Sequence, residues 1–458
     1  MTYFFETYGC EMNKAESAAA EQLLLARGWT KALNEQVADL VIINTCSVRA
    51  TAESRIVGRL GYYTGLKALR AGTPGAKDKT LDDAARLIAE KGPVPLTLVV
   101  MGCMAQRLLH TLKEQFPVVD YVVGTYAKNS LGTIVTAVER GQKPFELDED
   151  PAYSFASLSV EQGAFSSFVP IMNGCNNFCT YCIVPYVRGR EVSRPLSQIK
   201  TELDQLSQRG VKEITLLGQN VNSYNSDGLT FPALLEAITN HLEKTNSSIK
   251  WIRFESSHPK DLSDELIHVI AKNPYVCKGI HLPVQHGSSE ILKRMNRRYS
   301  REDYLCLVQQ MKENISDLSL ITDIMVGFPG ETEEDVEQVL SLMDEVQYQS
   351  AFMYYFNPRE GTPAAKYEDQ IDIEIKKARL QKIIDKQLSI TTAVLSKRVG
   401  KTVTVLADAV SRDNSAELLG KTEQNERVAF AAEKSLIGGF CTVHLDSLSG
   451  NTFRGTIV

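Results

Sequence analysis

The sequence has no long hydrophobic run and no strong excess of one charge, and its first residues lead us to expect no signal peptide. None of its apolar stretches approaches the roughly 20 residues that a membrane-spanning helix needs. The first residues, Met-Thr-Tyr-Phe-Phe-Glu, lack the basic and apolar regions of a secretory signal. A net charge of −6 does not by itself indicate a nucleic-acid partner. We therefore expect a cytoplasmic protein with no membrane partner.

The cysteine content argues against a disulfide framework. The chain has nine cysteines, an odd number, in a sequence that otherwise reads as intracellular. At 458 residues it is also too long for one core, so two or three domains are expected. Metal binding or catalysis is the better explanation for the thiols.

One cysteine motif is unusually specific. Cys175, Cys179 and Cys182 have the spacing C-x3-C-x2-C, with an aromatic residue, Tyr181, before the last cysteine. Three thiolates can hold three irons of a 4Fe–4S cluster, whereas such clusters normally take four protein ligands. The missing ligand suggests that a cofactor or substrate occupies the fourth iron, as S-adenosylmethionine (SAM) does in radical SAM enzymes. The alternative is a zinc site with a distant fourth ligand.

Three further cysteines share a position in a predicted α/β domain, residues 1–148. Cys10, Cys46 and Cys103 each come just after a predicted strand, at 3–8, 38–44 and 96–101. Ligands bind at the carboxyl ends of parallel strands in open α/β sheets, so these thiols are predicted to converge on a second metal site. The alternative is three ordinary buried cysteines. Helices are predicted at 15–27, 48–69 and 105–115, and residues 71–95 are predicted to form a surface insertion around a short helix at 81–90.

The rest of the chain predicts a linker and two more domains. Residues 149–167 read as the linker, and residues 168–392 contain six β/α units, which fit a partial parallel barrel with the cysteine motif at its mouth. The predicted elements of these units include strands at 213–217 and 319–326 and helices at 264–272 and 333–346. A long helix is predicted from 373 to about 396. Residues 393–458 include five short strands and predict a small β-barrel of a type often used for nucleic acids.

Polar residues end several of the predicted barrel strands. Because ligands collect at that edge, these residues are predicted to line a cofactor pocket and to hydrogen-bond SAM. They are Gln219, Asn220, Ser256, Gln285 and Asp323.

Basic residues are clustered despite the acidic total. Arg188, Arg190 and Arg194 follow the cysteine motif, Lys293–Arg301 holds a second group, and residues 376–401 hold a third. Such a run is usually a solvated helix face. Beside a small β-barrel and a metal site, binding to a phosphate backbone is favoured.

Taken together, the motifs resemble the radical SAM methylthiotransferases. The resemblance rests on Thr-Tyr-Gly-Cys10, Asn-Thr-Cys46-Ser-Val-Arg, Gly-Cys103-Met-Ala-Gln and the C-x3-C-x2-C motif, and covers essentially the whole chain. It implies a TRAM-type domain at the C-terminus. One motif is similar to that of the branch that acts on isopentenylated adenosine in tRNA, namely Arg188-Gly-Arg190-Glu191-Val-Ser-Arg194. This similarity implies that the substrate contacts four residues, Arg188, Arg190, Glu191 and Arg194. The chain departs from the family in its 71–95 insertion and in His286, where a small residue is usual.

The resemblance also implies a mechanism with two 4Fe–4S clusters and SAM. The cluster on Cys175, Cys179 and Cys182 would reduce SAM and generate a hydrogen-abstracting radical. The cluster on Cys10, Cys46 and Cys103 would carry the sulfur, which a second SAM methylates. No side chain acts as an acid or base. An electron donor such as flavodoxin or ferredoxin and a sulfur source are implied partners.

Four other functions are compatible with the sequence. A methylthiotransferase for a ribosomal protein, or for threonylcarbamoyladenosine in tRNA, would share every cysteine and differ in its substrate surface. A radical SAM enzyme with another reaction would not need the first three cysteines. A non-enzymatic iron–sulfur or zinc RNA-binding module would need no cofactor pocket.

Overall fold

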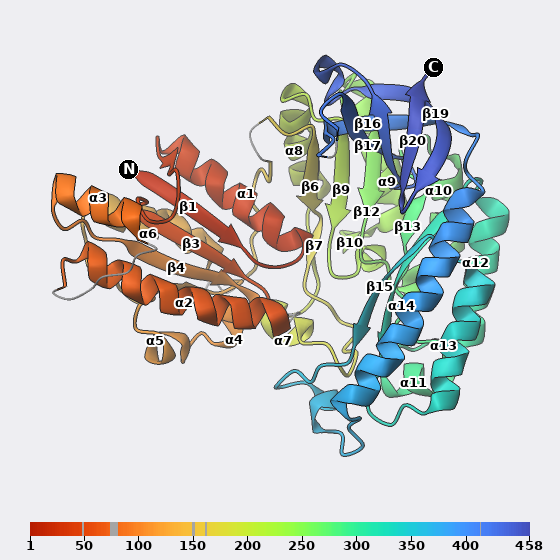
Figure 1. Cartoon of the computed structure of the whole chain (residues 1–458), viewed down its shortest axis with the longest axis horizontal. Coiled ribbons are helices and arrows are strands. Elements are labelled where there is room, and N and C mark those ends of the chain that lie inside the picture. The colour runs from red at the N-terminus through yellow and green to blue at the C-terminus, as the bar shows by residue number, and fades with distance from the viewer. Residues whose placement is uncertain (48–49, 74–80, 149–151, 161–162, 413) are drawn as a thin grey trace. The chain divides into compact units, whose positions relative to one another are not determined.

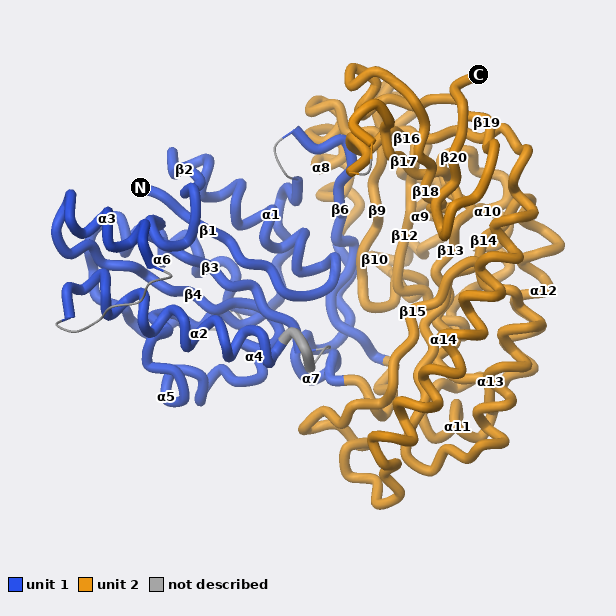
Figure 2. The backbone as a smooth tube through the Cα atoms, in the orientation of Figure 1, with its two compact units in different colours: residues 1–176, 183–194 blue, residues 177–182, 195–458 orange. Residues whose placement is uncertain are grey.

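The computed structural model describes residues 1–47, 50–73, 81–148, 152–160, 163–412 and 414–458 (Figure 1). The chain forms two compact units. The first comprises residues 1–176 and 183–194, and the second comprises residues 177–182 and 195–458 (Figure 2). The domain boundaries expected at 148, 168 and 393 remain predictions. No helix among the described residues is both long and apolar enough to span a membrane.

The first unit is built on a five-stranded parallel sheet. Its strands lie in the order β2-β1-β3-β4-β5. Every residue of β3 is buried, as expected for a central parallel strand covered on both faces. The strands are β1 (Thr2–Thr7), β2 (Thr30–Lys31), β3 (Leu40–Thr45), β4 (Thr97–Gly102) and β5 (Tyr121–Val123).

Helices cover both faces of this sheet and create two separate cores. On one face α1 (Glu11–Ala26) and α6 (Leu131–Glu139) pack against the strands. On the other face lie α2 (Ala50–Arg70) and α3 (Asp82–Lys91). The predicted α/β arrangement is confirmed, with helices on both sides as right-handed parallel crossovers require.

The segment predicted as a surface insertion is partly a core element. Helix α3 contacts α2, and both Leu81 and Ala84 are fully buried in the same cluster as Leu66 of α2. The prediction was wrong for this part because the apolar residues of 81–88 recur at helical spacing and find a partner in α2. Residues 74–80, like 48–49 at the predicted start of α2, lie outside the described residues.

Two other helical predictions differ from the structure. The helix expected at 105–115 is divided into α4 (Cys103–Arg107) and α5 (Leu112–Gln115). The break spans Leu108–Thr111 and includes His110 and Thr111, two residues of low helix propensity. Helices α6 and α7 (Val184–Arg188) were not predicted, because α6 is rich in β-branched residues and α7 is a single turn after the cysteine motif.

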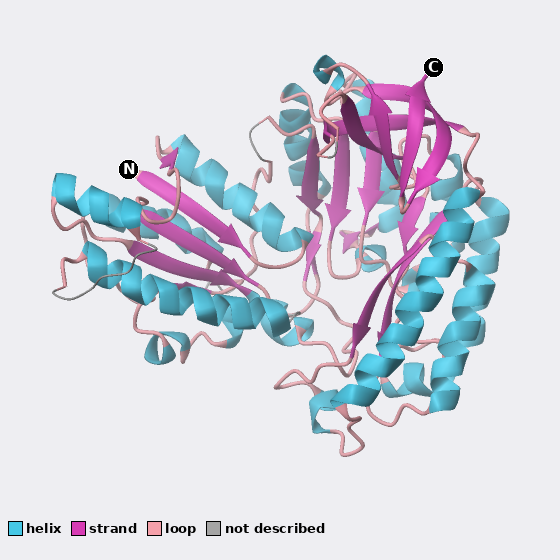
Figure 3. Cartoon of the chain, in the orientation of Figure 1, coloured by secondary structure: helices cyan, strands magenta, loops and turns pink. Residues whose placement is uncertain are grey.

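The second unit contains the parallel strands of a partial barrel (Figure 3). Strand β9 pairs with β12, and β13, β14 and β15 form a second sheet. One bridge, Ile252 to Val276, links β12 to the segment before β13. The strands are β9 (Glu213–Leu217), β12 (Trp251–Phe254), β13 (Gly279–His281), β14 (Ser319–Val326) and β15 (Ser350–Tyr355); β6 (Ser166–Pro170), the first predicted barrel strand, groups with the first unit.

Helices alternate with these strands as predicted. Several begin with a side-chain cap, as Ser263, Ser300 and Thr332 each accept a hydrogen bond from a backbone N–H of the first turn. The helices are α8 (Leu196–Gln208), α9 (Phe231–Lys244), α10 (Asp264–Lys272), α11 (Ser289–Arg294), α12 (Arg301–Asn314) and α13 (Glu333–Val346).

The C-terminal part is a closed five-stranded barrel that follows the long helix α14 (Ile373–Ser396). Leu395, at the end of α14, packs into the barrel core. The barrel strands are β16 (Thr402–Val410), β17 (Glu417–Thr422), β18 (Arg427–Ala431), β19 (Phe440–Ser449) and β20 (Thr452–Ile457). The expected small β-barrel is thus confirmed.

This barrel docks near the amino-terminal ends of the partial-barrel strands. The buried Arg253 of β12 donates to the carbonyl oxygens of Thr422 and Glu423, at 2.7 and 2.8 Å. A Cβ at Gly279, the first residue of β13, would lie 2.9 Å from the backbone of Gln424. The C-terminal barrel is therefore at the opposite end of these strands from their carboxyl edge, where ligands bind in such folds.

Candidate metal and cofactor sites

The three N-terminal cysteines follow three neighbouring strands at equivalent positions. Thr7 of β1 pairs with Asn44 of β3, and Asn44 pairs with Met101 of β4. Cys10 comes three residues after Thr7, and Cys46 and Cys103 each come two residues after their paired positions. All three cysteines therefore follow the carboxyl ends of neighbouring parallel strands, and their convergence on one metal site stays a prediction.

Glycine and asparagine residues allow the backbone segments at this edge to approach closely. A Cβ on Gly9 would lie 2.9 Å from the Cβ of Cys46, and Gly102, with φ +96°, lies against the backbone of Thr45. Asn13 and Asn44 are fully buried, and the Asn13 amide donates to the Asn44 side chain at 2.9 Å. These contacts hold the cysteine-bearing turns together, because a side chain at either glycine would force them apart.

Several buried polar atoms at this edge have no hydrogen-bond partner among the described residues. They include Glu16 Oε2, Ser47 Oγ and Arg188 Nη2. Ser47 follows Cys46 directly, and Arg188 Nη1 donates to Glu16 Oε1 at 2.8 Å. Since buried polar groups are normally paired, these orphaned atoms fit a site that holds an additional polar group. The sulfides and thiolates of an iron–sulfur cluster suit Arg188 in particular.

Electrostatics around Arg188 also suit an anionic group. Burial alone would raise the pKa of Glu16, but Arg188 and Lys128 outweigh it and lower this pKa to about 2. Burial raises the pKa of the Cys103 thiol, and the guanidinium of Arg188 opposes that rise. Two cations therefore face one buried carboxylate beside the cysteines, which leaves positive charge for thiolate ligands.

The second cysteine motif lies in the turn that follows β7 (Met172–Asn173). Cys175 and Cys179 are buried and Cys182 is partly exposed, and none of the three forms a disulfide. Cys182 N donates to the carbonyl oxygen of Cys179 at 2.9 Å, which makes a tight turn between the last two ligands. Among the described residues, no group of three His, Cys, Asp or Glu side chains is gathered closely enough to hold a metal ion. The assignment of both triads as ligands thus remains a prediction.

The predicted SAM residues lie at carboxyl ends of the partial-barrel strands in the second unit. Ser256 and Gln285 follow β12 and β13 with φ values of +66° and +69°, which non-glycine residues rarely adopt. Asn220, after β9, is buried and its amide donates to Asp261, while its Oδ1 has no partner among the described residues. Backbone strain and an unpartnered acceptor are both typical of ligand sites.

The other two predicted pocket residues have different environments. Asp323 lies within β14, with Oδ1 3.4 Å from Nε2 of His281 on β13, and both side chains are partly exposed. Burial would lower the pKa of His281, but the hydrogen bond that its ring donates to the Asp323 carboxylate outweighs burial and raises this pKa. Gln219 follows β9 and is partly exposed. His281, which sequence reasoning noted only as part of its strand, belongs with the candidate pocket.

The predicted substrate residues divide into buried and exposed members. Arg188 is 2% exposed, and Arg194 is equally buried and donates to the carbonyl oxygens of Ala156 and Pro170. Glu191 is partly exposed and accepts from the backbone N–H and the side chain of Asn176, at 3.1 and 3.2 Å. Arg190 is the exposed member. Arg188, Glu191 and Arg194 therefore make contacts within the protein, and Arg190 is exposed at the surface.

The basic residues of 376–401 are largely neutralised within the protein. Arg379 pairs with Glu331 and Glu333, and Arg398 pairs with Asp317 and Glu426. The lysines behave in the same way: Lys377, Lys382, Lys386 and Lys401 each pair with a carboxylate. Acidic residues of α14 and of neighbouring elements therefore pair with most of these cations, and phosphate binding by this segment stays a prediction.

His286, the departure from the family pattern, belongs to a buried structural network. Its Nε2 lies 3.0 Å from Glu331, and its Nδ1 accepts the N–H of Ser288. Glu331 also accepts the N–H of Gly327 and a hydrogen bond from Arg379. The network connects the loop after β14 to α14 and explains why an imidazole is accommodated there.

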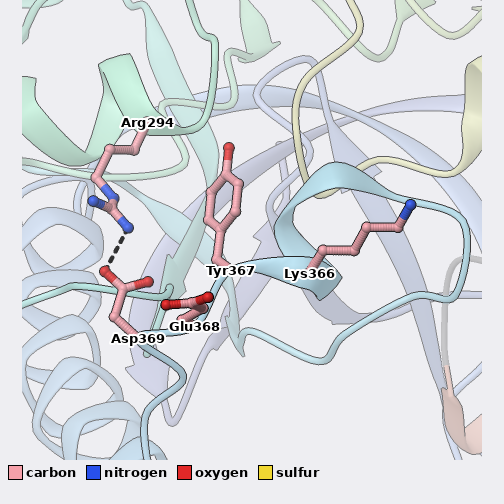
Figure 4. A pocket seen from close by; sticks show the side chains of 5 residues that line it. All are labelled: Arg294, Lys366, Tyr367, Glu368 and Asp369. Carbon is pink, nitrogen blue, oxygen red and sulfur yellow. Dashed lines mark hydrogen bonds and ion pairs between the residues drawn. The ribbon is translucent and has the colours of Figure 1, made fainter.

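An open pocket of about 620 Å³ lies beside the loop after β15 (Figure 4). Arg294 donates to Asp369 at 2.6 Å, and its guanidinium lies over the Tyr367 ring at 5.5 Å. The backbone oxygen of Arg294 accepts from Thr180 of the cysteine motif. The pocket is therefore adjacent to that motif, and two of its charged residues, Arg294 and Asp369, are already paired with each other.

Comparison with known families covers both units. Residues 169–343 match the Radical SAM superfamily, and residues 2–124 match Uncharacterized protein family UPF0004. Solved structures agree with the fold. The radical SAM methyltransferase TsrM from Kitasatospora setae, with cobalamin and a 4Fe–4S cluster bound, superposes with a TM-score of 0.58 at 15% identity, over 80% of this chain and 77% of its own.

Curated relatives match the chain over nearly its whole length. The tRNA-2-methylthio-N(6)-dimethylallyladenosine synthase of Treponema pallidum (strain Nichols) is 50% identical, over 100% of this chain and 99% of its own. A protein of the same name from Treponema denticola is 49% identical, over 100% of this chain and 100% of its own length. A third, from Clostridium botulinum (strain Langeland), is 40% identical, over 99% of this chain and 96% of its own length. The chain belongs to the radical SAM methylthiotransferases, in the group of the tRNA-2-methylthio-N(6)-dimethylallyladenosine synthases.

Proposed function

We propose that this chain transfers a methylthio group to carbon 2 of N(6)-dimethylallyladenosine, next to the anticodon of tRNA. The observation that carries the proposal is 50% identity, over the full length of both chains, to a synthase named for this product. The two cysteine motifs support the proposal, because they offer free thiols as candidate ligands for the two clusters. The ribosomal-protein alternative finds no support among these relatives.

Each part of the chain has a distinct task in this proposal. Cys175, Cys179 and Cys182 hold the 4Fe–4S cluster that binds SAM, and Cys10, Cys46 and Cys103 hold the auxiliary cluster. When bound, the clusters and SAM supply the electron, the hydrogen abstraction and the sulfur, chemistry that side chains cannot supply. The protein orients these groups and excludes water, and we assign no side chain as acid or base.

The SAM pocket is proposed at the carboxyl ends of β9, β12, β13 and β14. Gln219, Asn220, Ser256, Gln285 and Asp323 are the candidate hydrogen-bonding residues. The positive φ values of Ser256 and Gln285 support this assignment, since such strain is commonly retained where a ligand requires it. An external electron donor and a sulfur source complete the proposed reaction.

Purified, reconstituted enzyme is expected to modify an anticodon stem-loop whose adenosine carries a dimethylallyl group. The unmodified loop should react at least about tenfold more slowly, because burying the dimethylallyl chain adds contact worth about 1–3 kcal/mol. Nucleoside mass spectrometry measures the product. A ribosomal-protein peptide serves as the control substrate, and equal turnover of that peptide would contradict the proposal.

The C-terminal barrel is proposed to contribute tRNA affinity without taking part in the chemistry. Its exposed cations include Lys397 just before the barrel, Arg427 on β18 and Lys434 in the following loop, and none forms an ion pair among the described residues. These residues, unlike the paired cations of α14, are available to phosphates.

Replacing Lys397, Arg427 and Lys434 together with Gln is expected to weaken tRNA binding. Each phosphate contact removed should lower the slope of log Kd against log salt by about 0.7–0.9. SAM cleavage should stay at the wild-type rate. A matched triple variant, Lys377→Gln, Lys382→Gln and Lys386→Gln, removes ion-paired cations and should change the slope less. Equal slopes in both triple variants would exclude the barrel surface as the tRNA contact.

A further inference from the structure

A buried arginine contacts the second cysteine motif from the segment after α11. This segment, residues 295–298, forms one wall of the motif: the N–H of Thr180 donates to the carbonyl oxygen of Met295 at 3.1 Å. The Asn296 amide donates to the carbonyl oxygens of Asn177 and Phe178, at 3.3 and 3.0 Å. The backbone of the motif is therefore held by residues immediately before Arg297.

All three guanidinium nitrogens of Arg297 have polar partners in the protein. Its Nε donates to the Tyr299 hydroxyl at 2.9 Å, and its Nη2 donates to the Pro283 carbonyl oxygen at 2.9 Å. Its Nη1 donates to Cys179 Sγ at 3.4 Å and lies 3.5 Å from the Tyr181 hydroxyl. With 5% of its surface exposed, Arg297 is not available to the tRNA backbone that the basic cluster 293–301 suggested.

No carboxylate among the described residues pairs with this buried cation. Every hydrogen-bond partner of its guanidinium is a hydroxyl, a carbonyl oxygen or a thiol. Burying an unpaired charge is costly, so an anionic partner is expected in the functional protein. Among these partners only Cys179 is a predicted cluster ligand, and a cysteine binds a metal as its thiolate.

We propose that Arg297 is a positioning residue that raises the reduction potential of the cluster held by Cys175, Cys179 and Cys182. A charged hydrogen bond to a ligand sulfur favours the more negative, reduced cluster over the oxidised one. The step is the addition of one electron from an external reductant, with no bond made or broken in the protein. The inference rests on the proposed cluster and is independent of the tRNA substrate.

The test uses the full chain with Cys10, Cys46 and Cys103 replaced by Ala, so that one cluster remains. After anaerobic reconstitution, the reduced fraction is followed by electron paramagnetic resonance during a dithionite-based redox titration. At the midpoint of this parent protein, Arg297→Met should lower the ratio of reduced to oxidised cluster at least tenfold, equivalent to about 59 mV for one electron. Arg297→Lys, which keeps the charge, should show a smaller shift.

The matched control is Arg298→Met. Arg298 is the next residue and is exposed. Its replacement therefore removes the same type of side chain from the same segment without removing a contact to the cysteine motif. Its midpoint should equal that of the parent. An unchanged midpoint in Arg297→Met at full iron content would overturn the proposal.

Iron and sulfide analysis separates the possible failures. If Arg297→Met does not retain a cluster, Arg297→Gln replaces it, and an unchanged midpoint in that variant would equally overturn the proposal. If the parent protein itself binds no cluster, the cofactor assignment in the proposed function fails. If the parent binds a cluster but the enzyme is inactive on tRNA, only the substrate assignment fails.

Discussion

Replacing Cys175, Cys179 and Cys182 together with Ala is expected to leave about four of the roughly eight irons in reconstituted protein, because two clusters of four irons are held independently. Cleavage of SAM to 5′-deoxyadenosine should be lost completely. Replacing Cys10, Cys46 and Cys103 should also leave about four irons, yet preserve SAM cleavage and abolish methylthiolation. Iron and sulfide analysis and product chromatography measure these outcomes.

Cys306→Ala provides the control for the two triple variants. Cys306 is exposed on α12 and belongs to neither triad, so its loss should change neither iron content nor activity. Complete loss of iron from either triple variant would contradict independent clusters. Stoichiometric zinc in the wild-type protein would instead support the structural metal site left open by the sequence.

Arg188→Met is expected to destabilise the protein and impair the auxiliary cluster. The substitution leaves the buried Glu16 with Lys128 as its remaining cation, and breaking a buried ion pair costs about 3–5 kcal/mol. Iron should fall from about eight toward four, since the unpartnered Nη2 of Arg188 lies in the site that the cluster is expected to fill. Denaturant unfolding of the apoprotein and iron analysis test the two effects separately.

Arg190→Met is the matched control for this variant. Arg190 is exposed, so its replacement should change the unfolding free energy by less than about 0.5 kcal/mol and leave the iron content unchanged. Weaker tRNA binding is its expected effect. Wild-type stability and iron content in Arg188→Met would mean that Arg188 supports neither Glu16 nor the cluster.

The ion pair of Glu16 also predicts a pH dependence. Its pKa is about 2 in the folded protein and near 4.5 when unperturbed, so its stabilising contribution is fully present above pH 4.5. That contribution, on the order of 3 kcal/mol for this shift, is lost as the pH falls from 4.5 toward 2. In Arg188→Met the loss over the same interval should be smaller. Unfolding free energies between about pH 5 and pH 2 provide the comparison.

Sequence reasoning was most successful where local pattern and packing agree. The limits of β9, β14, α10 and α13 were predicted to the residue. Their boundaries carry clear signals, such as the caps Ser263 and Thr332 and the apolar cores of the strands. The split of 105–115 and the short α7 were missed because single-turn helices depend on tertiary contacts more than on propensity.

The sequence by itself determined the two cysteine motifs, the α/β pattern that brings Cys10, Cys46 and Cys103 to one sheet edge, and the C-terminal β-barrel. These depend on residue spacing and hydrophobic period, which are local properties of the chain. Only the tertiary structure decided the roles of the charged residues. Arg188 and Arg297 looked like surface cations for tRNA, yet both are buried beside cysteines. Burial and ion pairing depend on which distant elements pack together, as Glu16 and Arg188 do across 172 positions, and no local pattern records that.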